Sequence, residues 1–423
     1  MAATDHGQSS RLRVYAVLIV LSTIPLIAKI PLKGNLIIIG QLPVGSAVVT
    51  PFDIYLLALT IISIALHQKA WIPKTLTVLS FIGIVVASSI SLVLNGVRLQ
   101  GIIETIQWIQ MGIFTVAIGL LLQSERDIQY ILEVLVKISS IKAIWTIIYF
   151  VIYGYPGRRF NALVEGAALV ILIGLIIQDC QDWSLNLHLI PLAGAVLISQ
   201  ERKVWVALVV SSFAITALYA TSGNRRKILK MLPWFLAGFL VLLFAAGFLL
   251  PSEILARMGT LFSILPWVGD PVQFERLYVY RTGLEIFQHN PIFGVGPDGW
   301  YQTANMYGTD NFIDFQKRTK NVYVGPHSIF IKVLSEIGAV GFMFFLLLVV
   351  QPFRFAGYYI KRDSTSRASN LGMTMFAFYI YVLFYASVYS SSTLIRVYMF
   401  LPFGILLSLD LHNEPGNTKN EQF

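Results

Sequence analysis

Long apolar runs recur along almost the whole chain and are separated by short polar segments. A bilayer core about 30 Å thick is crossed by roughly 20 apolar residues in a helix, so runs of this length predict membrane-spanning helices. They lie near 14–32, 51–67, 72–94, 102–122, 129–153, 160–178, 187–200, 203–221, 231–250, 327–353, 371–390 and 393–411. The pattern predicts an all-α polytopic membrane protein with about twelve transmembrane helices.

Two segments depart from this pattern. The stretch 33–50 is apolar but is interrupted by glycine and proline, which predicts a re-entrant or interfacial segment. Residues 251–326 are polar and contain amphipathic stretches of helical length, notably 273–289. Loops this long are usually functional. We therefore expect an N-terminal bundle of about nine spans (1–250), a long loop with short helices (251–326), and C-terminal spans with a tail (327–423).

Composition and charge support this interpretation and give it an orientation. With 56% hydrophobic and 13% charged residues, the chain is too apolar for a soluble globular or disordered protein. The net charge of +9 then reports cytoplasmic loops and anionic membrane lipid rather than nucleic acid. Lysine and arginine favour one set of loops about two to one, which places both termini in the cytoplasm and 251–326 outside. The first apolar run has no small-residue cleavage site, so we expect a retained span.

Several arginines are exceptions to this charge bias because they fall in outer segments. They are Arg158, Arg159, Arg202, Arg276 and Arg281. Guanidinium groups match phosphate oxygens and keep their charge at any physiological pH. Together they predict an anionic substrate such as a lipid-linked diphosphate. The alternative is that each binds lipid phosphates or pairs with a nearby carboxylate, such as Glu201, Glu275 or Glu285.

His327 is the most informative single residue. It follows Gly325-Pro326 at the start of an apolar run, and proline marks helix starts. The positive end of a helix disfavours imidazolium, so the ring is expected to be neutral at pH 7. A neutral imidazole near a substrate hydroxyl is what a general base requires. The alternative is an interfacial histidine that only caps the helix.

Other features of this region have structural interpretations. Lys332 and Glu336 are an i, i+4 pair expected to neutralise each other. Gly338 and Gly341 predict a small-residue face for close helix packing. The glycines of 294–299 predict a turn, because the register of a phosphate-binding loop is absent. No Asp-x-Asp occurs and the only cysteine is Cys180, so neither a metal–diphosphate grip nor a cysteine zinc site is expected.

Two stretches together resemble a known family. In Arg276–Gly296, an arginine is followed by an aromatic residue at Tyr280, an amphipathic helix and Pro-x-x-Gly-x-Gly. Further on, His327-Ser328 is followed by nine residues and then Gly338. This order resembles the O-antigen ligase and O-antigen polymerase superfamily of bacterial envelope-glycan assembly over roughly 195–350. The N-terminal half is similar only in span count and apolar character.

The resemblance implies a fold and an activity. Such proteins are similar to lipid-phosphosugar-dependent (GT-C-like) glycosyltransferases, which need no metal or cofactor. They act at the outer face of the plasma (inner) membrane, and their donor is a glycan on undecaprenyl diphosphate. The acceptor is lipid-anchored in ligases, for example lipid A-core, and another glycan in polymerases. The spacing of His327-Ser328 and Gly338 resembles that of ligases, and attack opposite the diphosphate implies inversion at the anomeric carbon.

The resemblance also implies roles for individual residues. The family base corresponds to His327, and the loop arginine corresponds to Arg276 with Arg281 one turn on. Arg202 matches the arginine of the short turn, although Glu201 stands where the family often has serine. Arg159 matches an arginine-then-asparagine pattern, and Trp300, Tyr301, Tyr307 and Tyr323 are candidates for stacking on sugars.

Two other classes remain open. A flippase for lipid-linked oligosaccharides would bind the same anion, and it predicts mid-span ionisable residues and internal symmetry. A peptidoglycan polymerase of the shape, elongation and division type would use an acidic residue in an outer loop.

Overall fold

The computed structural model describes residues 76–122, 124–153, 162–178, 183–199, 201–221, 271–308, 312–313, 325–361, 366–388 and 393–412, and four short strands between 30 and 49. The predicted spans near 51–67 and 231–250, and most of the one near 14–32, lie outside these residues. So do Arg158, Arg159 and Tyr323.

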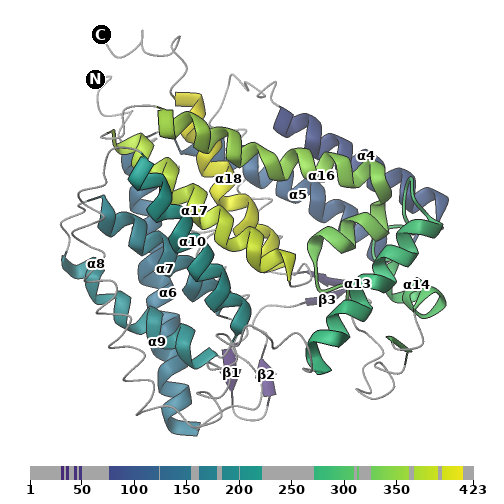
Figure 1. Ribbon diagram of the computed structural model, residues 1–423, viewed down its shortest axis with the longest axis horizontal. Helices are drawn as coiled ribbons and strands as arrows, with labels where there is room; N and C mark the ends of the chain where they lie inside the picture. Colours follow the sequence, from purple (N-terminus) through teal and green to yellow (C-terminus); the bar gives the residue numbers. More distant parts are fainter. Residues whose placement is uncertain are drawn as a thin grey trace.

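Helices make up the body of the described chain (Figure 1). They are α4 (Leu76–Leu94), α5 (Leu99–Leu121), α6 (Glu125–Tyr153), α7 (Leu163–Ile177), α8 (Trp183–Leu187), α9 (Leu189–Ser199), α10 (Arg202–Thr221), α13 (Pro271–His289), α14 (Trp300–Tyr307), α16 (Ile329–Lys361), α17 (Arg367–Ser387) and α18 (Thr393–His412). Six of them, α4, α5, α6, α10, α16 and α17, are long and apolar enough to cross a membrane. The predicted runs from 72 to 221 and from 327 to 411 each coincide with one of the described helices, so a multi-pass helical membrane protein is confirmed.

Two antiparallel hairpins lie in and just before the stretch 33–50, which was predicted to be re-entrant or interfacial. Strand β1 (Ile30–Leu32) pairs with β2 (Asn35–Ile37), and β3 (Leu42–Val44) pairs with β4 (Ala47–Val49). Each pair is joined by two residues of which one is glycine, a composition typical of tight hairpin turns.

Helix α17 lies at the centre of the bundle. It packs against α7, α10, α16 and α18, while α5 packs along α18 and α4 along α16 (Figure 1). The side chains of Phe378, Tyr379 and Tyr381 are fully buried. Because lipid tails are as apolar as these side chains, tight van der Waals packing rather than exclusion from water holds the helices together. The tyrosine hydroxyls are satisfied by carbonyls, Tyr379 by Val349 and Tyr381 by Leu163.

Helix α16 is broken at Gly338, whose φ of 71° and ψ of −169° are not helical. The break leaves carbonyls of the first half and amides of the second half without partners in the helix. Segment 291–296 supplies them through four backbone hydrogen bonds: Ala339 N to Pro291 O (2.8 Å), Val340 N to Ile292 O (3.2 Å), Val295 N to Ser335 O (3.1 Å) and Gly296 N to Glu336 O (2.9 Å). The prediction that Gly338 belongs to a small-residue helix face is therefore wrong, because this glycine ends one half-helix.

Two glycines allow the backbones to approach this closely. A Cβ on Gly338 would lie 2.4 Å from the carbonyl oxygen of Ile292, and one on Gly294 would lie 2.5 Å from the carbonyl carbon of Glu336. Both glycines also have positive φ, which side chains rarely adopt. The predicted turn at 294–299 is thus confirmed, and its glycines serve to dock it onto α16.

Candidate functional site

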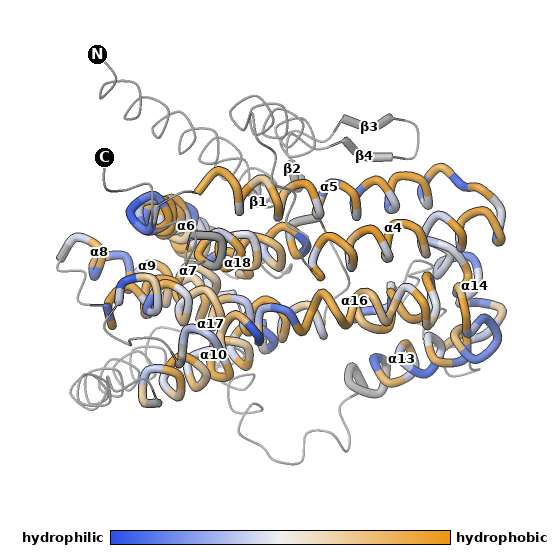
Figure 2. Tube along the Cα trace, turned by 90° about the horizontal axis from the view of Figure 1, so that it is seen from above, coloured by the Kyte–Doolittle hydropathy of each residue, from blue (hydrophilic) through white to orange (hydrophobic). Residues whose placement is uncertain are grey.

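Residues 271–313 contain a small hydrophobic core of their own beside the bundle. It is formed by Val279, Ile286, Val295, Trp300, Ala304 and Phe312. Helix α13, which confirms the amphipathic helix predicted at 273–289, packs on the first half of α16. Gly283 makes the contact close, since a Cβ there would lie 2.3 Å from Ile331. Figure 2 shows hydrophilic positions gathered along α13 and α14, while the bundle helices are mainly hydrophobic.

His327 lies two residues before α16 begins, rather than in its first turn. Its φ of 48° falls in the left-handed region, which is strained for a residue other than glycine and is concentrated at functional sites. Burial and the positive charges of Arg276 and Lys203 lower the pKa of His327 to about 4. The ring is therefore neutral at pH 7 as expected, but burial and two cations cause this.

The residues around His327 come from separate parts of the chain. Arg276 lies on α13 and Lys203 in the first turn of α10, and both act on the charge of the imidazole. Arg202 is the first residue of α10 and so is adjacent to Lys203 in the chain. Arg281, by contrast, has a side chain that is 69% exposed and lies 4.0 Å from Glu285. Of the candidates from the sequence, Arg276 acts on the charge of His327, and Lys203 acts on it as well.

Lys203 is held in a defined setting. Its Nζ lies 4.5 Å from the centre of the Tyr385 ring and 3.8 Å from Oε2 of Glu201. The Tyr385 hydroxyl donates a hydrogen bond to the same carboxylate oxygen (3.3 Å). Burial raises the pKa of Glu201, which reduces its capacity to neutralise Lys203. The sequence carried a signal for Lys203, since it is a second outer cation next to Arg202, but its role was missed.

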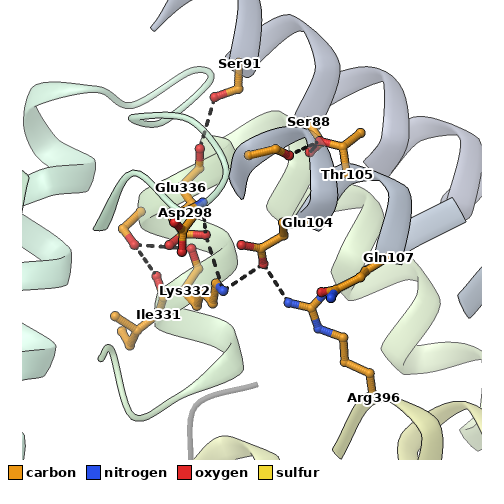
Figure 3. Close-up of polar contacts among 12 residues, drawn as sticks. Ser88, Ser91, Glu104, Thr105, Gln107, Asp298, Ile331, Lys332, Glu336 and Arg396 are labelled. Atoms are coloured by element: carbon orange, nitrogen blue, oxygen red, sulfur yellow. Dashed lines mark hydrogen bonds and ion pairs between the residues drawn. The ribbon is translucent and has the colours of Figure 1, made fainter. Parts of the chain in front are cut away.

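A buried ionic network lies nearby (Figure 3). Oε1 of Glu104 on α5 is 2.8 Å from Nζ of Lys332 and 2.6 Å from Nη2 of Arg396 on α18. Lys332 lies farther, 3.8 Å, from Glu336, whose Oε2 accepts a hydrogen bond from the backbone amide of Asp298 (3.1 Å). The predicted pairing of Lys332 with Glu336 is therefore confirmed, but a closer carboxylate, that of Glu104, also pairs with Lys332.

The aromatic candidates for sugar stacking separate into different environments. Trp300 is 0% exposed at the centre of the small core, so its predicted stacking role is wrong. Tyr301 is exposed, and the ring of Tyr307 lies 4.6 Å from that of His289. Within the described ranges, no three His, Cys, Asp or Glu side chains are placed to hold a metal ion.

A comparison with known protein families gives a match to part of the chain. A family model described as O-Antigen ligase matches residues 187–346, while no curated protein matches the chain. The matched segment contains α10, α13 and the first half of α16, and therefore Arg202, Lys203, Arg276 and His327. It also contains both sides of the break at Gly338. Residues 187–346 of this multi-pass membrane protein thus form an O-antigen ligase-like domain.

Proposed function

We propose that the protein transfers a glycan from an undecaprenyl-diphosphate donor to a lipid-anchored acceptor such as lipid A-core. The reaction takes place at the outer face of the bacterial inner membrane and uses neither metal nor cofactor. The observation that carries this proposal is a neutral imidazole, His327, beside two cations from different helices, Arg276 and Lys203, within an O-antigen ligase-like domain. Cations of this kind bind a diphosphate, and a neutral imidazole can take a proton from a sugar hydroxyl.

The cations bind the donor and stabilise its leaving group. Arg276 and Lys203 contact the diphosphate, with Arg202 beside Lys203 and Arg281 one helical turn from Arg276 as further contacts. Negative charge builds on the diphosphate as the glycosidic bond breaks. Cations fixed in advance favour this transition state over the ground state. Loss of one such contact costs about 2.7–4 kcal/mol, or roughly a hundred- to a thousand-fold in rate.

Donor binding also activates the base. With a pKa of about 4, His327 is a weak base in the free protein. A bound diphosphate brings negative charge next to Arg276 and Lys203, which offsets their effect and raises the pKa of His327. The imidazole then takes the proton of the acceptor hydroxyl, the hydroxyl oxygen bonds to the anomeric carbon, and the bond to the diphosphate breaks with inversion. General-base help of this kind contributes about a hundred- to ten-thousand-fold.

One observation bears on the alternatives. A polymerase would share this donor site and differ only in using a carrier-linked glycan as acceptor. A flippase would need a path of charges at mid-span. The paired charges Glu104, Lys332 and Arg396 instead lie within the first two turns of α5, α16 and α18, and Lys142 near the middle of α6 is paired with Glu165. The position of the Glu104 network near helix ends supports the enzyme over the transporter.

The test is glycan transfer by purified protein in lipid nanodiscs supplied with donor and acceptor lipid. His327→Ala should lower kcat by about a hundred- to ten-thousand-fold. His289→Ala is the matched control, because His289 is an exposed histidine on the same loop, and it should transfer at the wild-type rate. If folded His327→Ala protein keeps the wild-type rate, His327 is not the base. The length distribution of the products separates ligation of whole glycans from polymerisation.

A further inference from the structure

The half-helix that follows His327 cannot be positioned by the rest of α16. Gly338 interrupts the helix, so residues 329–337 are not continuous in backbone hydrogen bonding with 339–361. Segment 291–296 holds the half-helix at its C-terminal end through two backbone bonds, from Val295 N to Ser335 O and from Gly296 N to Glu336 O. His327 lies beyond the opposite end, where different contacts must fix it.

Helix α13 packs on this part of the half-helix, and Lys332, five residues after His327, adds a polar tether to the bundle. Its Nζ lies 2.8 Å from Oε1 of Glu104, and Nη2 of Arg396 lies 2.6 Å from the same oxygen (Figure 3). Arg396 is fixed further by a hydrogen bond from Nη1 to Gln107 on α5 (2.9 Å). Helices α5 and α18 pack against each other. One carboxylate oxygen therefore ties the half-helix to a rigid pair of helices.

The network is not explained by stability alone. Replacing a buried ion pair by apolar residues of similar volume is often neutral or stabilising, so such a pair is weak support for a stabilising role. The network also does not act directly on the imidazole, since burial, Arg276 and Lys203 are what perturb its charge. Any influence of Lys332 on His327 must pass through the position of the half-helix.

We propose that Lys332 is a positioning residue which, through Glu104 and Arg396, fixes the half-helix 329–337 and with it the half-buried imidazole of His327 at its start. Its consequence for turnover rests on the proposed function. Its consequence for the surroundings of His327 does not depend on the proposed function and can be tested without any substrate.

The test compares Lys332→Met with a matched control, Lys142→Met. Lys142 forms an ion pair with Glu165 at the same distance, 2.8 Å, and its side chain has the same exposure, 13%. That pair joins α6 to α7, not the half-helix. The six histidines are labelled at Cε1 and titrated by NMR, and the signal absent from His327→Gln identifies His327.

In the wild type and in Lys142→Met, His327 should titrate near pH 4. In Lys332→Met the ring is released towards water, and its titration midpoint should move up towards 6.5. Glycan transfer should lose about a hundred-fold in kcat, as expected for a reacting group displaced by about 1 Å, with a smaller change in KM. Lys332→Arg keeps the charge and should restore both properties.

An unchanged titration of His327 in folded Lys332→Met overturns the inference, whether or not the protein transfers glycans. If the wild type transfers no glycan, the proposed function fails while the titration still decides the positioning role. If Lys332→Met does not fold, Glu104→Gln replaces it, because this change keeps the shape and removes the charge. The midpoint should again rise, and a midpoint that stays near 4 overturns the inference.

Discussion

The break in α16 allows a sharp test of how the domain is held together, through Gly338→Ala. The φ and ψ of Gly338 are almost exclusive to glycine, and forcing another residue to adopt them costs about 1–3 kcal/mol. The new Cβ would also lie within 2.4–2.6 Å of backbone atoms of Ile292 and Gly294, which cannot rotate away as side chains can. Segment 291–296 must therefore move, and the bonds of Ala339 to Pro291 and of Val340 to Ile292 weaken at about 1 kcal/mol each. The expected fall in the free energy of unfolding is about 3–5 kcal/mol.

Denaturant-induced unfolding in mixed micelles measures this change. Gly357→Ala is the matched control, because Gly357 lies in the same helix and a Cβ there meets no atom within 4 Å. That substitution should leave stability unchanged or raise it by about 1 kcal/mol, since alanine favours the helix. The reasoning is refuted if Gly338→Ala unfolds at the same denaturant concentration as Gly357→Ala.

Four further predictions follow from the same structure. Gly294→Ala should lower the free energy of unfolding as Gly338→Ala does. The double variant should lose less than the sum of the two single losses, because both substitutions disturb the junction between segment 291–296 and α16, and additive losses would contradict this. In steady-state kinetics, kcat/KM should decrease as the pH is lowered through about 4, the pKa of His327 in the free protein. The value of kcat should decrease at a higher pH, because the bound donor raises the pKa of His327. If kcat and kcat/KM decrease at the same pH, donor binding does not activate the base. The folded pKa of His327, about 4, lies below the ordinary 6.5, so the unfolded chain takes up the proton first. Stability should thus fall as pH drops from 6.5 to 4, by up to about 3 kcal/mol relative to His327→Gln. Lys203→Met and Arg276→Gln should each lower kcat/KM about a hundred-fold or more and raise the titration midpoint of His327. An unchanged kcat/KM in both variants would remove the two cations from the donor site.

Hydropathy predicted the described spans because a helix that lies in lipid must itself consist mainly of apolar residues. The distribution of charge made Arg276 a candidate, since arginines on the outer face are exceptions to the usual excess of basic residues in cytoplasmic loops. Local pattern could not reveal the break at Gly338, because the run 327–353 is uninterrupted in hydropathy. The break exists only because segment 291–296 supplies the missing hydrogen bonds.

Ion pairs and contacts between side chains far apart in the sequence were also hard to predict, because local patterns do not show them. The pairing of Lys332 with Glu336 is visible within one helical turn, whereas Glu104 lies far away in the sequence. Trp300 was expected at the surface, as aromatic residues often are at a membrane interface, but the small core of 271–313 buries it. Lys203 was counted as an outer cation in the sequence, but only the fold shows that it lies near His327.

The shared carboxylate of Glu104 has a consequence for biogenesis. Arg396 follows Glu104 by 292 residues, and Lys332 comes nearly as late. At about 5–20 residues per second, the ribosome needs roughly 15–60 s to deliver the last counter-ion. For most of that interval, until Lys332 is made, α5 carries an acidic group without either cation, and this is costly in hydrocarbon. A nascent chain truncated before α16 should therefore leave α5 loosely inserted and open to quality-control proteases, and its final seating should await the last helix.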